Sequence, residues 1–393
     1  MSFKVKKILY LTFYFEPDLC AGSFRNTSLA KELAKISEDI AEIHLFTTQP
    51  NRYNSFQLRA SENEVFGNLR ICRIDIPKHQ NGMKDQIISF RTYYKEVIKK
   101  TKAEKYDIVF ASSSRLFTAY LGYKVAKKKS TLLYIDVRDI FYDTMKDVLK
   151  NDFVKSLTLP FFKLIEKITF NYSTHINLIS EGFIPYFNSY KKNYSYYTNG
   201  IDSIFLQPKE NIQAQNHPDG VKTIVYAGNI GEGQGLHAII PDVAAELQDY
   251  RFIIIGDGGA KYKLEKELIN NNIKNVELRK PVKQDELINI YKKADFLFLH
   301  LNNYKAFEKV LPSKIFELAA FDKPIIAGVG GYARDFLIKN VPNVILFSPS
   351  NSSEMANKVR NYKYERIIRD EFINTFKREN INKEITKSIL GYL

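Results

Sequence analysis

Short apolar runs alternate with longer amphipathic stretches along this 393-residue chain, and the alternation occurs in two successive rounds. Short apolar runs are typical of buried strands, whereas apolar residues spaced three and four apart are typical of helices. Strands that alternate with helices form βαβ units, and such units build parallel sheets. The sequence therefore predicts an α/β protein made of two Rossmann-like, doubly wound domains that face each other across a cleft.

The first round contains apolar runs at Ile8–Phe13, Ile43–Thr47, Leu69–Ile74, Asp107–Ala111, Leu132–Asp136 and His175–Ile179. The amphipathic stretches between them are Arg25–Ile36, Phe117–Lys127 and Val154–Phe170. The second round predicts strands at Thr223–Ala227, Phe252–Gly256, Val276–Leu278, Phe296–His300, Pro324–Ala327 and Val344–Leu346. Its predicted helices are Gly235–Leu247, Lys261–Asn270, Gln284–Lys293 and Ser313–Ala320.

A domain boundary is expected after Asn199-Gly200, which gives an N-terminal domain of residues 1–200 and a C-terminal domain of residues 201–366. The stretch Ser203–Gly220 is mostly polar, contains two prolines and shows no periodicity, so it predicts a linker. Residues 367–393 include a predicted helix at Ile367–Leu390, after the second sheet has ended, which is placed to cross back to the first domain.

The charge is uneven. Residues 1–200 contain 31 Lys and Arg against 20 Asp and Glu, whereas residues 201–393 contain 27 against 24. A basic first half indicates an anionic partner, either a membrane surface, a nucleic acid or a phosphate-bearing lipid. The alternative is a set of solvated faces in a lysine-rich protein, because no long basic block stands out.

Two features indicate the compartment. The chain has two cysteines, Cys20 and Cys72, which argues against a disulfide scaffold and for a reducing cytosol. No apolar run approaches the roughly 18–20 residues that span a bilayer, and the apolar N-terminus leads into Glu16 and Pro17 like a first strand. We expect a cytoplasmic protein.

Ligands of doubly wound sheets bind outside the carboxyl ends of the strands, so the strand-end loops are the candidate sites. After the first strand, Gly22 stands just before a helix, where backbone N–H groups can approach an anion. Arg25 would add a planar cation. The alternative is an ordinary turn with Arg25 on the surface.

The loop Gly228–Gly235 contains four glycines in eight residues, with Asn229 and Gln234 between them. Close approach of the backbone to a diphosphate explains such a loop, although it matches neither the dinucleotide fingerprint nor a P-loop. A loop without a ligand is the alternative. A second tight turn is expected at Gly256–Gly259.

The segment Lys309–Glu317 is the strongest candidate. Ser313 is expected to cap a helix whose free N–H groups hold phosphate, helped by Lys309 and Lys314. Glu317, one turn into the helix, is expected to accept the hydroxyls of a ribose. A favourable charge near a helix N-terminus is the alternative for Glu317.

Three charged side chains, Asp136, Arg138 and Asp139, end the buried strand Leu132–Asp136. Charged groups at such a place rarely serve packing. They form either an internal ion pair or a polar set around a reacting sugar, and we favour the second interpretation.

Taken together, the motifs resemble those of the retaining glycosyltransferases of family 4, which have the GT-B fold, and in particular bacterial enzymes of O-antigen and capsule synthesis. The matching segments are EPDLCAGSFR, YDIVFASSSRLFTA, DVRD, TNGID, YAGNIGEGQGL, IGDG and VLPSKIFELAAFDKPIIA. The resemblance implies a nucleoside-diphosphate sugar as donor, with uridine as the base, and a hexosyl- or N-acetylhexosaminyl-type transfer. It also implies a lipid-diphosphate-linked saccharide as acceptor and no metal or other cofactor.

The resemblance assigns the donor to the second domain, with Glu317 on the ribose and the phosphates at the Gly228 loop and at Ser313. Gly235, Asn229, Gln234, Gly22 and Arg25 complete the donor-binding set. The acceptor is expected on the first domain, near Gly22 and the Asp136–Asp139 strand end.

For catalysis, Lys314, Lys309 and Arg138 would stabilise the departing diphosphate. Asp136 or Asp139 would orient the acceptor or contact the sugar hydroxyls.

Three departures from the family pattern stand out. Asn229 and Gln234 occupy positions where many members have Arg and Lys, and Lys309 occupies a position where many have Glu. Ala111–Ser114 replaces a stretch that commonly carries His. Other residues must then neutralise the phosphate charge, as in relatives whose helix begins at Pro-Ser-Lys.

Two other classes share some of these features. A GT-B-fold sugar-nucleotide 2-epimerase would need further carboxylates and a His around the sugar, and a nucleic-acid binder would need its aromatic residues on one exposed face. The stretch Phe153–Tyr172 has apolar residues near one helical face and lysines beside them, interrupted by Pro160. This helix either lies in the headgroup plane of a membrane or packs under the first sheet.

Overall fold

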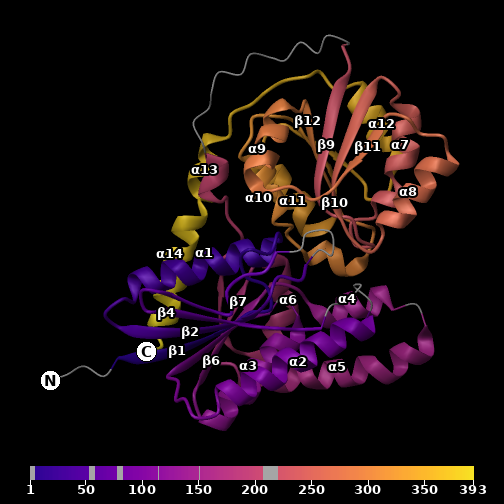
Figure 1. The fold of residues 1–393 in the computed structure, drawn as a ribbon. Helices are drawn as coiled ribbons and strands as arrows, with labels where there is room; N and C mark the ends of the chain where they lie inside the picture. The colour runs from indigo at the N-terminus through magenta and orange to yellow at the C-terminus, as the bar shows by residue number, and fades with distance from the viewer. Residues whose placement is uncertain (1–4, 53–57, 78–82, 114, 150, 207–219) are drawn as a thin grey trace. The chain divides into compact units, whose positions relative to one another are not determined.

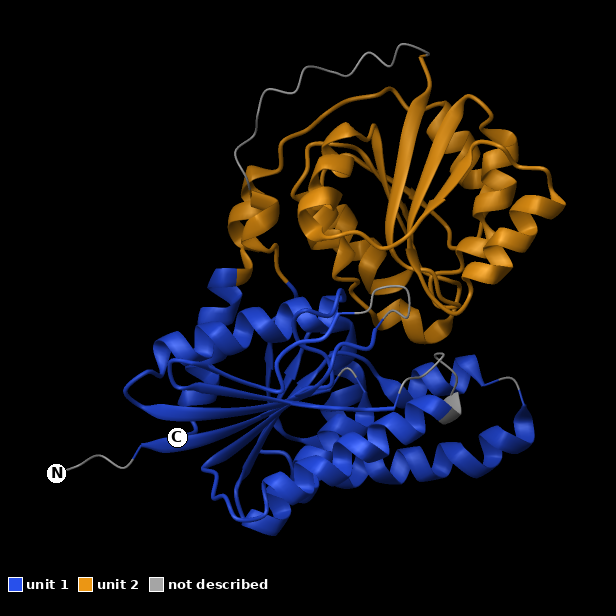
Figure 2. Ribbon diagram, in the orientation of Figure 1, with its two compact units in different colours: residues 1–199, 379–393 blue, residues 200–378 orange. Residues whose placement is uncertain are grey.

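The structure, a computed structural model, describes residues 5–52, 58–77, 83–113, 115–149, 151–206 and 220–393. Its contacts divide the chain into two compact units (Figure 2). Unit 1 consists of Met1–Asn199 with Glu379–Leu393, and unit 2 is Gly200–Arg378. Each unit is built around its own sheet, so each is described by itself.

Unit 1 contains an eight-stranded sheet in the order β3-β4-β2-β1-β5-β6-β7-β8 (Figure 1). All its neighbouring strands pair in parallel except β3 with β4. The strands are β1 Lys6–Leu11, β2 Ala41–Thr48, β3 Asn63–Phe66, β4 Leu69–Ile74, β5 Ile108–Ser113, β6 Leu132–Val137, β7 His175–Leu178 and β8 Asn193–Tyr196. The longer helices are α1 Ala21–Ile36, α2 Met83–Lys100, α3 Leu116–Lys129, α4 Phe141–Val148, α5 Asp152–Tyr172 and α14 Arg378–Leu390, with α6 Ile184–Phe187 a single turn.

Helices cover both faces of this sheet, which explains why its central strands are apolar throughout. On one face, Leu29 and Leu33 of α1 and Ile385 of α14 share a core with Tyr10 and Phe110. The helices α2, α3 and α5 lie on the opposite side (Figure 1). The carboxyl ends of β1, β5 and β6 therefore form one edge from which the polar loops emerge.

Unit 2 contains a six-stranded sheet in the order β11-β10-β9-β12-β13-β14, with every pair parallel. The strands are β9 Lys222–Asn229, β10 Tyr250–Asp257, β11 Val276–Arg279, β12 Phe296–His300, β13 Ile325–Gly328 and β14 Val344–Phe347. The helices are α7 Ile240–Glu246, α8 Lys261–Asn270, α9 Gln284–Lys293, α10 Lys314–Ala319, α11 Gly331–Asn340, α12 Ser352–Arg360 and α13 Asp370–Thr375.

Alternate residues of β9 enter two separate cores, one on each face of the sheet. Val225 and Ala227 pack with residues of α9, α10 and α11, whereas Ile224 and Tyr226 pack with residues of α7, α8 and α12. This period of two is the consequence of strand geometry. It confirms the predicted α/β fold with two parallel sheets.

The structure contains every predicted strand and the predicted helices of both rounds, with ends shifted by a few residues, and only the C-terminal stretch departs from its predicted helix. It adds the edge strands β3 and β8 and the helices α2, α4, α6, α11 and α12, which the apolar pattern alone does not indicate. Of the predicted linker, Ser203–Leu206 forms a short 3-10 helix, and residues 207–219 lie outside the described residues.

The C-terminal stretch differs from the prediction, because it forms two helices instead of one. Between α13 and α14 the helical pattern is interrupted at Phe376 and Lys377: Ile201 N donates to Phe376 O at 2.8 Å, and Arg378 N donates to Ile201 O at 3.0 Å. These bonds pair Lys377 with Ile201 as an isolated parallel bridge, after which α14 begins at Arg378. Helix α13 thus stays with unit 2, and α14 packs on unit 1.

Candidate active site

In unit 2, two glycines bring the ends of β9 and β10 into close contact. A side chain at Gly256 would place its Cβ 1.8 Å from the carbonyl oxygen of Gly228, and Gly256 has a φ of +151°. Only glycine fits there. Packing between the two loops therefore explains the glycine at the predicted turn Gly256–Gly259. A residue without a side chain is needed there because the backbone of the glycine-rich loop lies against it.

The loop Gly228–Gly235 is tied to itself. Asn229 Nδ2 donates to Gln234 Oε1 at 2.7 Å, and the hydroxyl of Tyr226 donates to the Asn229 carbonyl at 2.6 Å. The two residues that replace the family's Arg and Lys thus bond to each other across the loop. Their side chains are uncharged, so a phosphate here needs a cation from another element.

His300, the last residue of β12, holds this loop in place through hydrogen bonds. No motif in the sequence indicated this role. The side chain is buried, and burial lowers the pKa of His300 to about 4, so the ring is neutral. Its Nε2 accepts from Ser350 N at 2.9 Å, which leaves Nδ1 as the donor to the Gln234 carbonyl at 2.6 Å.

Asn302 continues the same support two residues further on. Its backbone N–H donates to the Gly233 carbonyl at 2.8 Å, and its Nδ2 donates to the Glu232 carbonyl at 3.0 Å. Three successive carbonyls of the loop, from Glu232 to Gln234, are therefore bonded to the end of β12 and the residues just after it. Such bonds fix the shape of the loop, as is expected of a preorganised binding site.

Lys314 supplies the cation near this loop. Its Cε lies 3.8 Å from the position that a Cβ would take on Gly228, which places the side chain over the end of β9. Its Nζ donates to both carboxylate oxygens of Glu317, at 2.9 and 3.0 Å. The side chains are 24% and 17% exposed, so the pair is still accessible from solvent.

Tyr291 of α9 also contacts the Lys314–Glu317 pair. Its hydroxyl donates to Glu317 Oε1 at 3.0 Å, and its ring is fully buried. Burial raises the pKa of Tyr291 well above its ordinary value, and the Glu317 carboxylate adds to that shift. The tyrosine therefore stays protonated and fixes the orientation of the Glu317 side chain.

Ser313 does not act as predicted. It has a helical backbone, with φ of −59° and ψ of −25°, and its side chain makes no capping hydrogen bond. The N–H groups of Ile315 and Phe316 already donate to the carbonyls of Pro312 and Ser313, at 3.1 and 3.2 Å. These two N–H groups are therefore engaged in a tight turn, and the phosphate site at this helix stays a prediction.

Lys309 lies at the end of the short 3-10 helix Lys305–Lys309. The carbonyl oxygen of the neighbouring Glu308 packs against Gly331. A Cβ on Gly331 would lie only 2.1 Å from that oxygen. The close approach fixes the segment that carries Lys309 to the first turn of α11.

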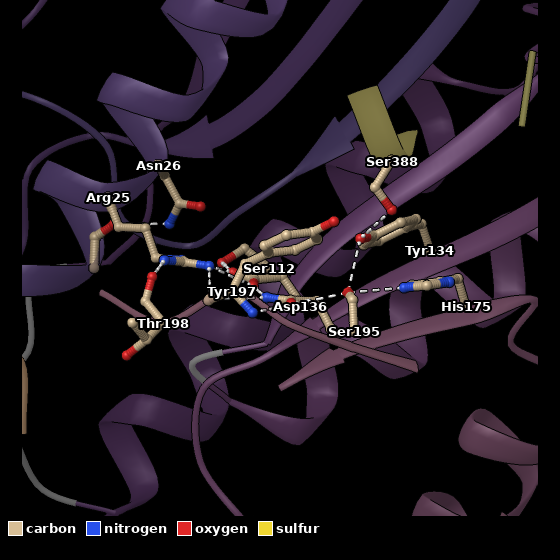
Figure 3. A network of polar contacts seen from close by, with 12 residues as sticks. Arg25, Asn26, Ser112, Tyr134, Asp136, His175, Ser195, Tyr197, Thr198 and Ser388 are labelled. Atoms are coloured by element: carbon tan, nitrogen blue, oxygen red, sulfur yellow. Dashed lines mark hydrogen bonds and ion pairs between the residues drawn. The ribbon is translucent and has the colours of Figure 1, made fainter. Parts of the chain in front are cut away.

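In unit 1, Arg25 and Asp136 form an internal ion pair, drawn in Figure 3. Arg25 donates from Nε to Asp136 Oδ2 at 3.1 Å and from Nη2 to Oδ1 at 2.9 Å. Its remaining N–H groups reach the carbonyls of Thr198 and Tyr197 at 2.8 and 3.0 Å. Both side chains are at most 1% exposed, so the pair forms part of the interior.

This pair corrects two predictions. Asp136 does not stand among groups around a sugar, and Arg25 is neither a surface residue nor a phosphate ligand. Burial alone would raise the pKa of Asp136, but the Arg25 charge and hydrogen bonds outweigh it and hold that pKa below its ordinary value. Asn177 Nδ2 adds a bond to Asp136 Oδ1 at 2.7 Å, which links the pair to β7.

Arg138, Gly22 and Asp139 remain at the carboxyl edge of the unit 1 sheet. A Cβ on Gly22 would lie 2.9 Å from Arg138 Nη1, so the guanidinium lies against the first turn of α1. Burial raises the pKa of Asp139 to about 6, although its Oδ1 accepts from the Thr144 hydroxyl at 3.1 Å. Asp139 therefore exchanges its proton near neutral pH.

Arg115 joins this edge, and sequence reasoning missed it. Its guanidinium lies 4.4 Å from the centre of the Phe13 ring, and Nη2 donates to the Tyr14 hydroxyl at 2.5 Å. It lies two residues after the end of β5 and directly before α3. The edge thus holds two arginines, Arg115 and Arg138, from neighbouring strands.

Across the part of the chain that the structure describes, no group of three or more His, Cys, Asp or Glu side chains is placed to hold a metal ion. Among the same residues, no helix has the length and apolar character needed to cross a bilayer.

Residues 207–379 match the family model described as glycosyl transferases group 1. This range contains the glycine-rich loop, His300 and the Lys314–Glu317 pair. A stretch of 182 residues is also 28% identical to WcaI of Escherichia coli (strain K12), a protein named for glycosyl transfer in colanic acid biosynthesis. That match covers 44% of this chain and 44% of WcaI, so it spans less than half of either protein.

Solved structures match nearly the whole chain at low identity. Sucrose-phosphate synthase from Thermosynechococcus elongatus gives a TM-score of 0.78 at 12% identity, with 98% of both chains covered. HepE from Anabaena, in complex with UDP and glucose, gives 0.68 at 15% identity, with 98% of this chain and 99% of that one covered. WaaG, a glycosyltransferase of lipopolysaccharide biosynthesis, gives 0.64 at 11%, covering 97% and 95%. These likenesses identify the fold as GT-B.

Proposed function

We propose that this protein is a glycosyltransferase that moves a sugar, with retention, from a UDP-sugar to a lipid-diphosphate-linked saccharide in surface polysaccharide synthesis. The observation that carries the proposal is the Lys314–Glu317 pair beside the glycine-rich loop, inside the region that matches the group 1 model. The solved complexes of HepE with UDP and glucose and with UDP-glucose support the donor, and the naming of WcaI for colanic acid biosynthesis supports the pathway.

In this proposal Glu317 accepts hydrogen bonds from the two ribose hydroxyls of the donor. Lys314 neutralises the diphosphate over Gly228, since Asn229 and Gln234 are uncharged. Because the leaving diphosphate gains negative charge as the sugar bond breaks, a fixed cation beside it stabilises the transition state more than the ground state. Lys309 adds a second positive charge on a neighbouring segment.

The acceptor is proposed to bind at the carboxyl edge of unit 1. Arg138 and Arg115 provide guanidinium groups that suit phosphate oxygens, and the missing side chain of Gly22 lets the Arg138 guanidinium lie close against α1. Asp139, whose pKa of about 6 lies near neutral pH, is placed to hydrogen-bond a sugar hydroxyl in either protonation state. A lipid-linked acceptor would keep the protein at the inner face of the cell membrane.

Glu317→Gln is expected to weaken UDP binding about 10- to 100-fold, since hydrogen bonds to a charged group contribute about 1.5–3 kcal/mol each. Isothermal titration calorimetry with UDP measures the effect. The matched control is Tyr291→Phe, which removes the hydroxyl that orients Glu317 but keeps the carboxylate. Unchanged UDP affinity in a folded Glu317→Gln protein would show that the ribose lies elsewhere.

Metal independence is the second expectation, because Lys314 and the arginines are proposed to supply the positive charge. Sugar transfer should proceed at an unchanged rate in excess EDTA. The control is a parallel reaction with added Mg²⁺ or Mn²⁺. Activity that disappears with EDTA and returns with either ion would contradict this part of the proposal.

A further inference from the structure

Unit 2 has a pocket of about 440 Å³, with helix α9 on one side and residues of β9, β10 and β11 on the other. The helix contributes Glu286, Asn289, Ile290 and Lys293 to the lining. Their spacing of three and four residues places them on one side of α9. Sites for small molecules typically enclose about 300–1,000 Å³, so the pocket has room for a ligand of that kind.

The floor of the pocket is apolar. Val225 of β9 and Ile253 of β10 are neighbours in the sheet register, Ala294 follows α9, and all three are buried. Alternate residues of a strand point to the same face of the sheet, which places Val225 and Ile253 toward α9. These side chains offer a ligand apolar contact but no hydrogen bond, so its polar groups must be bound at the rim.

Two arginines of the rim are held in place by one carboxylate. Arg279 Nε donates to Glu277 Oε1 at 2.7 Å, and Arg251 Nη2 donates to Glu277 Oε2 at 2.8 Å. The hydrogen bond from Arg279, and then the one from Arg251, hold the pKa of Glu277 below its ordinary value. Glu277 therefore stays ionised at neutral pH and keeps both guanidinium groups beside the pocket.

The positive charge of the rim is not fully balanced. Arg251 and Arg279 share the carboxylate of Glu277. Lys293 adds a third cation, and Glu286 is the other carboxylate beside them. Within the described part of the chain, Arg279 bonds only through Nε, and Lys293 Nζ forms no hydrogen bond or ion pair. The terminal nitrogens of Arg279 and the Lys293 ammonium are therefore free to bind a phosphate.

Helix α9 also connects the pocket to the candidate donor site. Its Tyr291 donates a hydrogen bond from the hydroxyl to Glu317 Oε1 at 3.0 Å, and the ring is fully buried. A ligand bound to Lys293 therefore holds the same helix that orients Glu317. The two sites are separate, because Thr223 of the pocket lies near the start of β9, whereas the glycine-rich loop begins at the end of that strand.

We propose that this pocket is a second ligand site, which binds a small organic phosphate and transmits its presence through α9 to the donor site. The apolar part of the ligand covers Val225 and Ile253, and its phosphate accepts hydrogen bonds from Arg279 and Lys293. Binding stabilises α9 in the position from which Tyr291 orients the donor-site carboxylate, so it raises the affinity for UDP. The pocket stands on its own as a ligand site, whereas its effect on UDP rests on the proposed function.

Phenyl phosphate is a probe with both parts of such a ligand, and isothermal titration calorimetry of the full chain measures its binding. It should bind about tenfold more tightly than inorganic phosphate, which lacks the apolar part, or benzyl alcohol, which lacks the charge. Arg279→Gln/Lys293→Gln should weaken its binding about tenfold or more. Asn289→Trp, at an exposed position on the pocket side of α9, should abolish binding because the indole fills the pocket.

The matched control is Lys339→Gln/Lys363→Gln, which removes two exposed lysines of unit 2 that do not line the pocket. It should bind phenyl phosphate like the wild type, and thermal unfolding shows that each variant is folded. No binding by the wild type, unchanged binding by Arg279→Gln/Lys293→Gln, or displacement of phenyl phosphate by UDP would each overturn the proposal. A wild-type dimer that Asn289→Trp abolishes, without phenyl phosphate binding, would assign the pocket to a second copy instead.

Titration of UDP with and without saturating phenyl phosphate tests the connection between the two sites. The affinity for UDP should rise about fivefold, and Tyr291→Phe should remove this effect while phenyl phosphate still binds. Two ligands that bind without affecting each other would overturn the connection through α9. A protein that binds phenyl phosphate but no UDP would refute the proposed function and leave the pocket as a ligand site. A protein that binds UDP but no phenyl phosphate would refute the pocket alone.

Discussion

Lys314→Met is expected to lower kcat about 10²- to 10³-fold, the loss typical when one charge-stabilising group is removed from a transition state. The lysine lies over Gly228 and bonds to both oxygens of Glu317. Methionine keeps a side chain of similar length, so the packing of α10 should change little. Because the charge on the leaving diphosphate grows during the reaction, the effect should fall on kcat more than on KM.

Steady-state kinetics with a UDP-sugar and the acceptor measures this effect. Lys314→Arg should recover part of the rate, since it keeps the charge. Lys305→Met is the matched control, because Lys305 is an exposed lysine of the same unit. A raised KM with an unchanged kcat would assign Lys314 to ground-state binding rather than to catalysis.

Arg25→Met is expected to lower the free energy of unfolding by about 3–5 kcal/mol, because it leaves a buried carboxylate without its partner. Asp136 is fully buried and receives two bonds from Arg25. The Thr198 carbonyl also loses the Arg25 donor, and the Tyr197 carbonyl keeps only its bond from Asn177 Nδ2 at 3.2 Å. Denaturant unfolding followed by circular dichroism measures the change.

A double variant and an exposed control make this test specific. Arg25→Met/Asp136→Asn should regain part of the stability, since the second change removes the isolated charge. Lys31→Met removes an exposed pair with Glu16, whose side chains are 46% and 44% exposed, and should cost less than about 1 kcal/mol. A loss of that small size for Arg25→Met would show that the pair does not hold unit 1 together.

The pH dependence of this pair follows from the depressed pKa of Asp136. A carboxyl whose pKa is lower in the folded state contributes stability above its unfolded pKa and loses it as the pH falls through the folded value. The difference between wild type and Arg25→Met should therefore be full at neutral pH. It should shrink in acid, below the ordinary pKa of an aspartate.

Sequence reasoning predicted the strands because parallel strands covered on both faces are apolar runs. The run Phe296–His300, for example, is β12 residue for residue. It did not predict β3, since every residue of that edge strand is exposed and leaves no apolar pattern. The sequence pattern also did not predict the break between α13 and α14. That break depends on the pairing of Lys377 with Ile201, which is far away in the chain.

The site was predictable where its chemistry is local. Lys314 and Glu317 lie three residues apart on one helix, so their contact follows from helical geometry. The Arg25–Asp136 pair joins residues 111 positions apart, and each looked like a ligand-binding group in its own loop. His300 gave no signal because its two partners are backbone atoms of distant loops. Contacts between residues that are far apart in the sequence decide which charged side chains are buried in ion pairs and which stay accessible at the ends of the strands. Residue type alone does not predict this.

Release of UDP from UDP-sugars, measured with and without a lipid-diphosphate-linked saccharide, tests the central claim most directly. The account predicts release that depends on the acceptor, is slower in Glu317→Gln at low donor concentration, and yields a product whose anomeric configuration by NMR matches that of the donor. An epimerase would instead interconvert sugar nucleotides without acceptor. No acceptor-dependent release from any UDP-sugar, or an inverted product, would contradict the account.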